Sequence, residues 1–209
     1  MSQVMIVDDE KDIRRLVEIT LDKEGIDVLK AENGEKALEI LNEESPDLIL
    51  LDINMPGLNG WETLKEMEKE GFTKESPVIM FTIEELTFVK MLREDVEGLV
   101  GYIEKPFKRE ELTNLVKDYI ENTKEIKNVR KKIEESPNGG EGLGEAYEAW
   151  SRSILIHKRF LEKLDRMEKE SKKDGKLARI ENMKAGEKNT IEHLKQKKKE
   201  IKRTVGLEK

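Results

Sequence analysis

The chain has 209 residues and a formal net charge of −7; charged residues make up 41% of it and aromatic residues only 5%. It has no cysteine, which excludes disulfides, thiolate catalysis and cysteine-ligated metal sites. No apolar run approaches the ~20 residues that a membrane-spanning helix needs, and the N-terminus lacks the pattern of a secretory signal. We therefore expect a cytoplasmic protein that does not bind a membrane.

The charge is unevenly distributed. Residues 1–120 contain 29 Asp/Glu and 15 Lys/Arg, a net of −14, whereas residues 121–209 contain 17 Asp/Glu and 24 Lys/Arg, a net of +7. An acidic first half and a basic second half indicate two modules with different roles.

The first 120 residues alternate short apolar runs with segments of helical periodicity. Runs that are apolar throughout are typical of strands buried on both faces, as in a parallel sheet covered by helices. The predicted elements are strand 4–7, helix 11–24, strand 26–31, helix 35–43, strand 47–52, helix 59–70, strand 78–82, helix 85–96, strand 99–103 and helix 109–120. Five strand–helix pairs predict an α/β fold, a doubly wound parallel sheet with strand order 2-1-3-4-5.

The last of these helices continues beyond residue 120. Apolar residues recur at helical spacing as far as Ile133, and the first breaker is the run Ser136-Pro137-Asn138-Gly139-Gly140. We expect this helix to extend to about residue 135, followed by a linker over 136–144 and helices over 145–172 and 176–204. The sequence thus predicts a first domain over 1–121 and an all-α hairpin or bundle over 122–209.

The last two helices have apolar residues at alternating spacings of three and four, the pattern of a coiled-coil seam. Lys184, Glu187 and Lys198 interrupt this seam with charge, so we expect the hairpin to need a partner. His157 lies on the same stripe. Phosphotransfer through His157 is disfavoured because Lys158-Arg159-Phe160 follow it instead of an acidic residue, and a histidine packed in the seam is the preferred interpretation.

Polar residues follow the predicted strands directly. At the carboxyl edge of an open α/β sheet, where ligands bind, they would converge although nearly a hundred positions separate them in the chain. Carboxylates, a hydroxyl and an ammonium in one place are suited to Mg²⁺-assisted phosphoryl transfer, because the metal and the ammonium neutralise the charge of the transferring group. The pieces are Asp8-Asp9, Asp52, Met55-Pro56-Gly57, Thr82 and Lys105-Pro106.

Taken singly, these residues have ordinary structural interpretations. Asp8-Asp9 and Asp52 could cap a helix or a loop, Thr82 could be a strand residue, and Lys105 a surface lysine. Their coincidence at the ends of successive strands favours the functional interpretation.

In these motifs, residues 3–120 resemble the receiver domain of two-component response regulators, a flavodoxin-like fold. The resemblance implies that Asp52 accepts a phosphoryl group from a histidine kinase. It also implies that Asp8, Asp9, Asp52 and the backbone carbonyl of Asn54 hold Mg²⁺, and that Thr82 and Lys105 contact the phosphoryl oxygens. The chain would be no enzyme beyond its own phosphorylation and dephosphorylation.

The resemblance also assigns a switch. Phosphorylation would move Thr82 and turn Tyr102 inward, changing the surface over 84–120. One residue departs from the family pattern: Ile83 stands where receivers usually have Ala or Gly, and its bulk would hinder access to the pocket.

The second half carries no recognisable DNA-reading motif. Its basic run Lys195-Gln196-Lys197-Lys198-Lys199, with Lys202-Arg203 beyond, is compatible with phosphate contacts but is more typical of a solvated helix face. We therefore expect residues 122–209 to bind a protein partner or a second copy of the chain, with nucleic-acid binding as the alternative.

Overall fold

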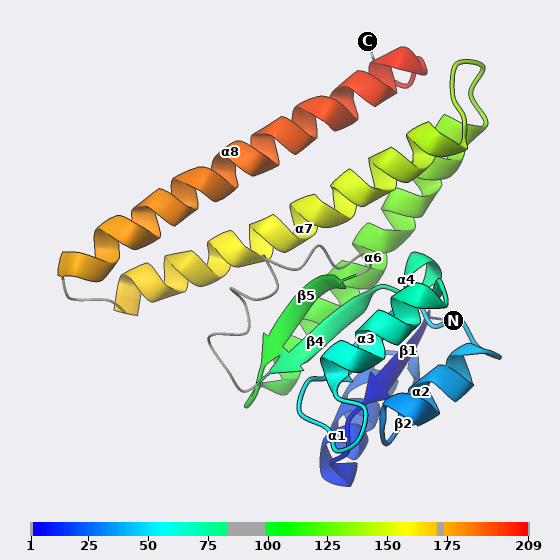
Figure 1. The fold of residues 1–209 in the computed structure, drawn as a ribbon, viewed down its shortest axis with the longest axis vertical. Coiled ribbons are helices and arrows are strands. Elements are labelled where there is room, and N and C mark those ends of the chain that lie inside the picture. Colours follow the sequence, from blue (N-terminus) through cyan, green and yellow to red (C-terminus); the bar gives the residue numbers. More distant parts are fainter. Residues whose placement is uncertain (1, 83–98, 171–173, 209) are drawn as a thin grey trace. The chain divides into compact units, whose positions relative to one another are not determined.

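The computed structural model describes residues 2–82, 99–170 and 174–208, except for the side chains of residues 82, 170, 174–176 and 179 (Figure 1). The chain forms two compact units, Met1–Asn122 and Thr123–Lys209. Within the described ranges, no helix combines the length and the apolar character that crossing a membrane requires.

The first unit is built on one sheet of five parallel strands in the order β2-β1-β3-β4-β5. The predicted fold class and strand order are confirmed. Every residue of the central strand β3 is buried, because helices cover both faces of the sheet. The strands are β1 (Ser2–Val7), β2 (Ile26–Ala31), β3 (Leu48–Asp52), β4 (Val78–Thr82) and β5 (Leu99–Glu104).

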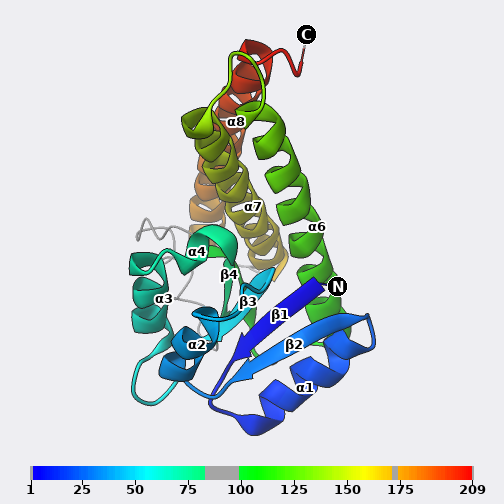
Figure 2. The ribbon, with the colours of Figure 1, turned by 90° about the vertical axis from the view of Figure 1, so that its right-hand side faces the viewer.

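Helices lie on both faces of this sheet. Figure 2 shows α1 and the first part of α6 on one face and α2 and α3 on the other. The helix predicted over 85–96 lies outside the described residues. The four-residue helix α4 was not predicted, because an element that short has no readable periodicity. The helices are α1 (Lys11–Asp22), α2 (Gly34–Leu41), α3 (Gly60–Lys69), α4 (Phe72–Glu75) and α6 (Arg109–Glu134).

The start of α3 is fitted closely to the end of β3. The Asn59 side chain accepts hydrogen bonds from the backbone N–H groups of Trp61 and Glu62, and the Glu62 carboxylate accepts one from the N–H of Asn59, which completes a capping box. A Cβ on Gly60 would lie 2.2 Å from the backbone oxygen of Asp52. Only glycine lets the helix approach this closely, so α3 supports the backbone that carries Asp52.

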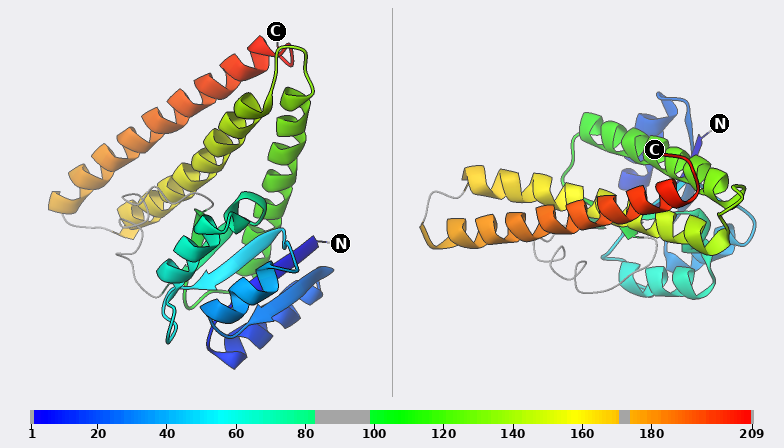
Figure 3. Two further views of the ribbon diagram at one scale, coloured as in Figure 1. Left: turned by 45° about the vertical axis from the view of Figure 1, so that its right-hand side comes forward. Right: turned by 90° about the horizontal axis from the view of Figure 1, so that it is seen from above.

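The second unit contains the end of α6, then α7 (Glu141–Glu170) and α8 (Asp174–Thr204). Figures 1 and 3 show α7 and α8 side by side and antiparallel. The predicted start of α7 at residue 145 was wrong. Gly142 and Gly144 were predicted to belong to the linker, but they lie in the first turn of α7. The backbone N–H of Gly144 donates a helical hydrogen bond to the Gly140 carbonyl at 3.1 Å. Glycine in a helix costs about 1 kcal/mol, which packing can offset.

An apolar cluster joins the three helices of the second unit. Ile133 of α6, Tyr147 of α7, Ile201 of α8 and Val205 just after α8 are buried together. Val129, Leu143, Ala146 and Trp150 pack around them half-buried. The end of α6 therefore belongs to the core of this unit.

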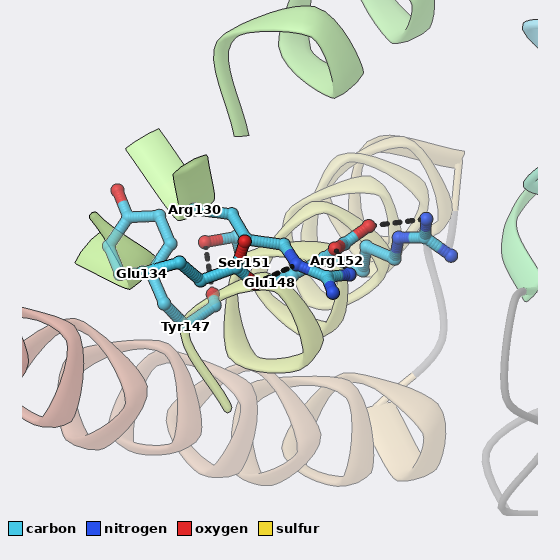
Figure 4. Close-up of polar contacts among 6 residues, drawn as sticks. All are labelled: Arg130, Glu134, Tyr147, Glu148, Ser151 and Arg152. Carbon is cyan, nitrogen blue, oxygen red and sulfur yellow. Dashed lines mark hydrogen bonds and ion pairs between the residues drawn. The ribbon is translucent and has the colours of Figure 1, made fainter. Parts of the chain in front are cut away.

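A network of charged residues lies beside this cluster (Figure 4). The carboxylate of Glu148, on a residue only 6% exposed, accepts hydrogen bonds from Arg130 at 2.7 Å and Arg152 at 2.5 Å. Arg130 also donates to Glu134 at 2.6 Å, and the two carboxylates, Glu148 first, raise the pKa of Arg130. The Ser151 hydroxyl donates to the Tyr147 carbonyl at 2.6 Å. The network connects the α6 segment of this unit to α7.

Two of the three charged seam residues contact polar side chains of α7. Lys184 of α8 lies 2.5 Å from Asp165 and 2.7 Å from Glu168, both on α7. Glu187 contacts the Nδ1 of His157, so this histidine is indeed a seam residue. These pairs weaken our sequence argument that the hairpin needs a partner for its stability.

Candidate functional site

Three carboxylates meet at the carboxyl edge of the sheet. Asp8 and Asp9 follow β1, Asp52 ends β3, and these two strands are neighbours. One carboxylate oxygen from each residue lies within 4.8 Å of the others. Asp8 and Asp52 are buried, whereas Asp9 is exposed. The structure thus brings together the carboxylates that the sequence predicted for one site.

Lys105 reaches the same place from the end of β5, before a cis peptide bond to Pro106. Its Nζ is 2.8 Å from Asp8 Oδ2 and 3.2 Å from Asp52 Oδ1, and its side chain is 10% exposed. The ammonium therefore lies between the two buried carboxylates. On its other side, Nζ is 5.8 Å from the centre of the Phe81 ring.

The site is short of positive charge. Burial raises the pKa of Asp52; Lys105 lowers it, Asp8 raises it further, and the backbone N–H of Asn54 lowers it. For Lys105, burial lowers the pKa, but the hydrogen bond and charge of Asp8, joined by Asp52, outweigh burial and raise it. Among the described residues, the ammonium of Lys105 faces three carboxylates, and such a group of acids repels itself unless another cation is bound.

Asp52 also has an oxygen that is available for a ligand. Its Oδ1 is buried and has no hydrogen-bond partner among the described residues, although Lys105 lies nearby. A buried, unsatisfied carboxylate oxygen beside two further carboxylates fits a hard divalent cation such as Mg²⁺, which takes oxygen ligands.

Arg14 of α1 fixes the loop that carries two of these carboxylates. Its Nη1 donates to the backbone carbonyls of Asp8 at 2.6 Å and Asp9 at 2.9 Å. The Asp8 Oδ1 accepts from the backbone N–H of Glu10 at 2.9 Å, which leaves Oδ2 for Lys105. Arg14 was not predicted as a site residue; its signal in the sequence is an arginine five residues after Asp9, near the start of the predicted helix.

The remaining predicted residues are only partly described. Thr82 ends β4 in register with Glu104. The side chain of Thr82, Ile83 and residues 84–98 of the predicted output surface lie outside the described part of the chain. Tyr102 on β5 is buried, with 9% of its surface exposed. Asn54 is exposed on the loop after Asp52.

Comparisons with known proteins agree with this geometry. A family model described as response regulator receiver domain matches residues 4–117. A CheY-like receiver domain protein from Methanospirillum hungatei is 27% identical with a TM-score of 0.53, and the match covers 59% of this chain and 98% of that one. CheY4, a chemotaxis protein of Vibrio cholerae, is 32% identical with a TM-score of 0.53, over 57% of this chain and 98% of its own.

A match to a longer protein extends further. NtrX from Brucella abortus is 29% identical with a TM-score of 0.56, and the match covers 74% of this chain but 34% of NtrX. This similarity therefore includes more of the chain than the matches to isolated receiver domains do.

Proposed function

The chain belongs to the response regulator receiver domain family, and on that premise we propose that Asp52 accepts a phosphoryl group from a histidine kinase in a Mg²⁺-dependent reaction. The observation that carries the proposal is the convergence of Asp8, Asp9 and Asp52 within 4.8 Å, with the Lys105 ammonium between two of them. The chain would catalyse only its own phosphorylation and dephosphorylation.

Each residue has a distinct role in this proposal. Asp8, Asp9 and Asp52, with the backbone carbonyl of Asn54, would hold Mg²⁺, which when bound supplies positive charge to the phosphoryl oxygens. A carboxylate oxygen of Asp52 attacks phosphorus, the bond from phosphorus to the donor breaks, and an acyl phosphate forms. Lys105 and Thr82 would contact the phosphoryl oxygens. Arg14 holds the acidic loop in place throughout.

Incubation of the chain with acetyl phosphate and Mg²⁺ is expected to add one phosphoryl group, detected by intact mass spectrometry. Chelation of Mg²⁺ should abolish the addition, because Lys105 alone cannot compensate three carboxylates and an incoming phosphoryl group. Added Mg²⁺ should restore it. Peptide mapping should place the group on Asp52. Equal incorporation without divalent cation, or a modified residue elsewhere, would contradict the proposal.

The output is proposed to run through Thr82 and Tyr102 to the surface over 84–120, part of which lies outside the described residues. The helical second unit would then bind a protein partner or a second copy of the chain. The match to NtrX, which extends beyond the receiver domain, supports an output region in this part of the sequence. Nucleic-acid binding remains the second candidate, because Lys197, Lys198 and Lys202 make no ion pair within the described part of the chain.

Light scattering can test this output. With Mg²⁺ and beryllofluoride, a phosphoryl mimic, the full chain is expected to form a larger species, whereas an Asp52→Asn variant should not respond. An unchanged molar mass would rule out self-association and leave a foreign partner. For the alternative, retention on duplex DNA should fall steeply as salt rises, since phosphate contacts release counterions. Absence of retention at low salt would eliminate it.

A further inference from the structure

Lys198 differs from the other charged residues of the α7–α8 seam. Lys184, on the same helix, is paired with Asp165 and Glu168, and Glu187 is paired with His157. For Lys198, no carboxylate partner exists among the residues that the structure describes. Lys184 and Lys198 are 14 residues apart and so occupy the same heptad position, but within the described part of the chain only Lys184 contacts carboxylates.

The Lys198 amine lies instead among aromatic rings and other amines. Its Nζ is 4.6 Å from the centre of the ring of Tyr147, which is buried. The Nζ of Lys202 is 5.7 Å from the same ring, and that of Lys197 is 5.0 Å from the ring of Trp150. Three amines of one helix are thus gathered over two rings of α7, and Lys198 itself is half-buried.

These surroundings favour the neutral amine. Burial removes water from the ammonium, and the nearby Lys202 of α8 and Lys158 of α7 repel a further positive charge, whereas Glu125 of α6 attracts it. The Tyr147 ring also attracts an ammonium, but such contacts are worth only about 0.5–2 kcal/mol. The balance, dominated by burial, lowers the pKa of Lys198 to about 8. The Lys184 pKa is instead raised by Asp165 and Glu168.

We propose that Lys198 is a modification site whose amine is acylated by acyl phosphates. The lone pair of the neutral Nζ attacks the carbonyl carbon of the acyl phosphate. The carbon–oxygen bond to phosphate breaks, phosphate leaves with the electron pair, and the surplus proton on nitrogen passes to water. The product is an amide, and no oxidation or reduction is involved. Nothing in this step depends on phosphorylation of Asp52.

Acylation would change the charge of the seam. It removes a cation that Lys202 repels, and it leaves the amide over the ring of Tyr147. The basic face made by Lys197, Lys198 and Lys202 would lose one of its three charges. A partner that recognises this face through its charge would therefore bind the acylated chain more weakly.

The test is competitive labelling of the full chain with acetyl phosphate in the absence of Mg²⁺, which suppresses transfer to Asp52. Site occupancy is measured by mass spectrometry after cleavage at glutamate. At pH 7.5, Lys198 is expected to be acetylated about tenfold faster than Lys184, because its larger neutral fraction outweighs its lower intrinsic basicity. Its rate should level off above about pH 8. The rate at Lys184 should still be rising at pH 10.

Two variants at one position sharpen the test. Lys202→Glu places a carboxylate one turn from Lys198 and should remove most of its advantage in rate, whereas Lys202→Met should remove only part of it. Circular dichroism checks that the helices persist. If either variant loses its helices, the pH profiles of labelling at Lys198 and Lys184 in the unaltered chain decide whether the proposal holds. Lys198 labelling no faster than Lys184, or rising in parallel with it to pH 10, overturns the proposal.

Discussion

Replacing Asp52 with asparagine is expected to abolish phosphoryl incorporation and, at the same time, to stabilise the receiver unit when no metal is bound. The amide is no nucleophile toward phosphorus, so the first effect is complete. The second follows from the burial of Asp52, which is 3% exposed; its Oδ1 lies 3.2 Å from the Lys105 ammonium, but burial and the nearby Asp8 still raise its pKa. Removing that charge should gain on the order of 1 kcal/mol in free energy of unfolding.

The pKa of Asp52 determines how the stability difference between the two proteins changes with pH. Burial raises the pKa of Asp52 above its ordinary 3.8, so between the two values the folded chain binds more protons than the unfolded chain. The free energy of unfolding then falls as the pH rises through that interval, and it remains lower at neutral pH because the buried Asp52 is charged there. The advantage of the asparagine variant should accordingly be present at pH 7 and vanish well below pH 4.

Urea denaturation followed by Trp61 fluorescence, in a Trp150→Phe background, would measure the stability. Asp47→Asn is the matched control. Asp47 lies just before β3, and its Oδ2 accepts a hydrogen bond from the backbone N–H of Gln3 at 3.0 Å, a bond that asparagine can also accept. That variant should incorporate phosphoryl groups normally. Labelling of Asp52→Asn at the rate of the unaltered chain would show that the phosphoacceptor is another residue.

Replacing Glu148 with leucine is expected to destabilise the second unit by about 2–3 kcal/mol. The change leaves the guanidinium groups of Arg130 and Arg152 half-buried without the carboxylate that both contact. Removing one partner of a buried ion pair usually costs about 3–5 kcal/mol. The expected loss is smaller because Arg130 keeps Glu134 and its side chain is 27% exposed.

Two further variants separate this effect from a general loss of charge. Glu162→Leu removes the exposed partner of Arg159, a surface pair at 3.0 Å, and should cost less than about 1 kcal/mol. Adding Arg130→Met and Arg152→Met to Glu148→Leu should recover much of the stability, since the two guanidinium groups that contacted Glu148 are gone. The readout is urea denaturation followed by Trp150 fluorescence in a Trp61→Phe background. Equal costs for Glu148→Leu and Glu162→Leu would show that the network does not stabilise the unit.

The sequence predicted the carboxylates and the lysine of the site because a parallel sheet aligns its strand ends. A polar residue directly after a buried strand can only emerge at that edge, so Asp8, Asp52 and Lys105 were placed by topology alone. The contacts of Arg14 could not be predicted in this way. Its long side chain reaches the backbone carbonyls of Asp8 and Asp9, and the pattern of apolar residues does not show which groups such a side chain contacts. The sequence also could not show that Asp52 Oδ1 is buried without a hydrogen bond from the described residues, because this depends on the positions of side chains in space.

In the second unit, the sequence located the charged seam residues but not their partners. Lys184 and Glu187 were predicted to destabilise the seam. Their partners, two acids and a histidine, lie on α7, and which residues of α7 they meet depends on how the two helices align. The buried Glu148 was missed because a charged residue beside Tyr147 is normally interpreted as exposed. The start of α7 was missed because local glycine preference was overridden by tertiary packing.

The two polar pairs of the seam also determine which alignment of α7 and α8 is allowed. A purely apolar seam would let the helices slide by one heptad at little cost, since leucine and isoleucine would meet similar neighbours in either position. Such a slide would separate Glu187 from His157 and Lys184 from Asp165 and Glu168, and would break the contacts that these polar side chains make. Lys184 and Glu187, two of the three residues that interrupt the hydrophobic pattern, therefore specify a single arrangement of the hairpin.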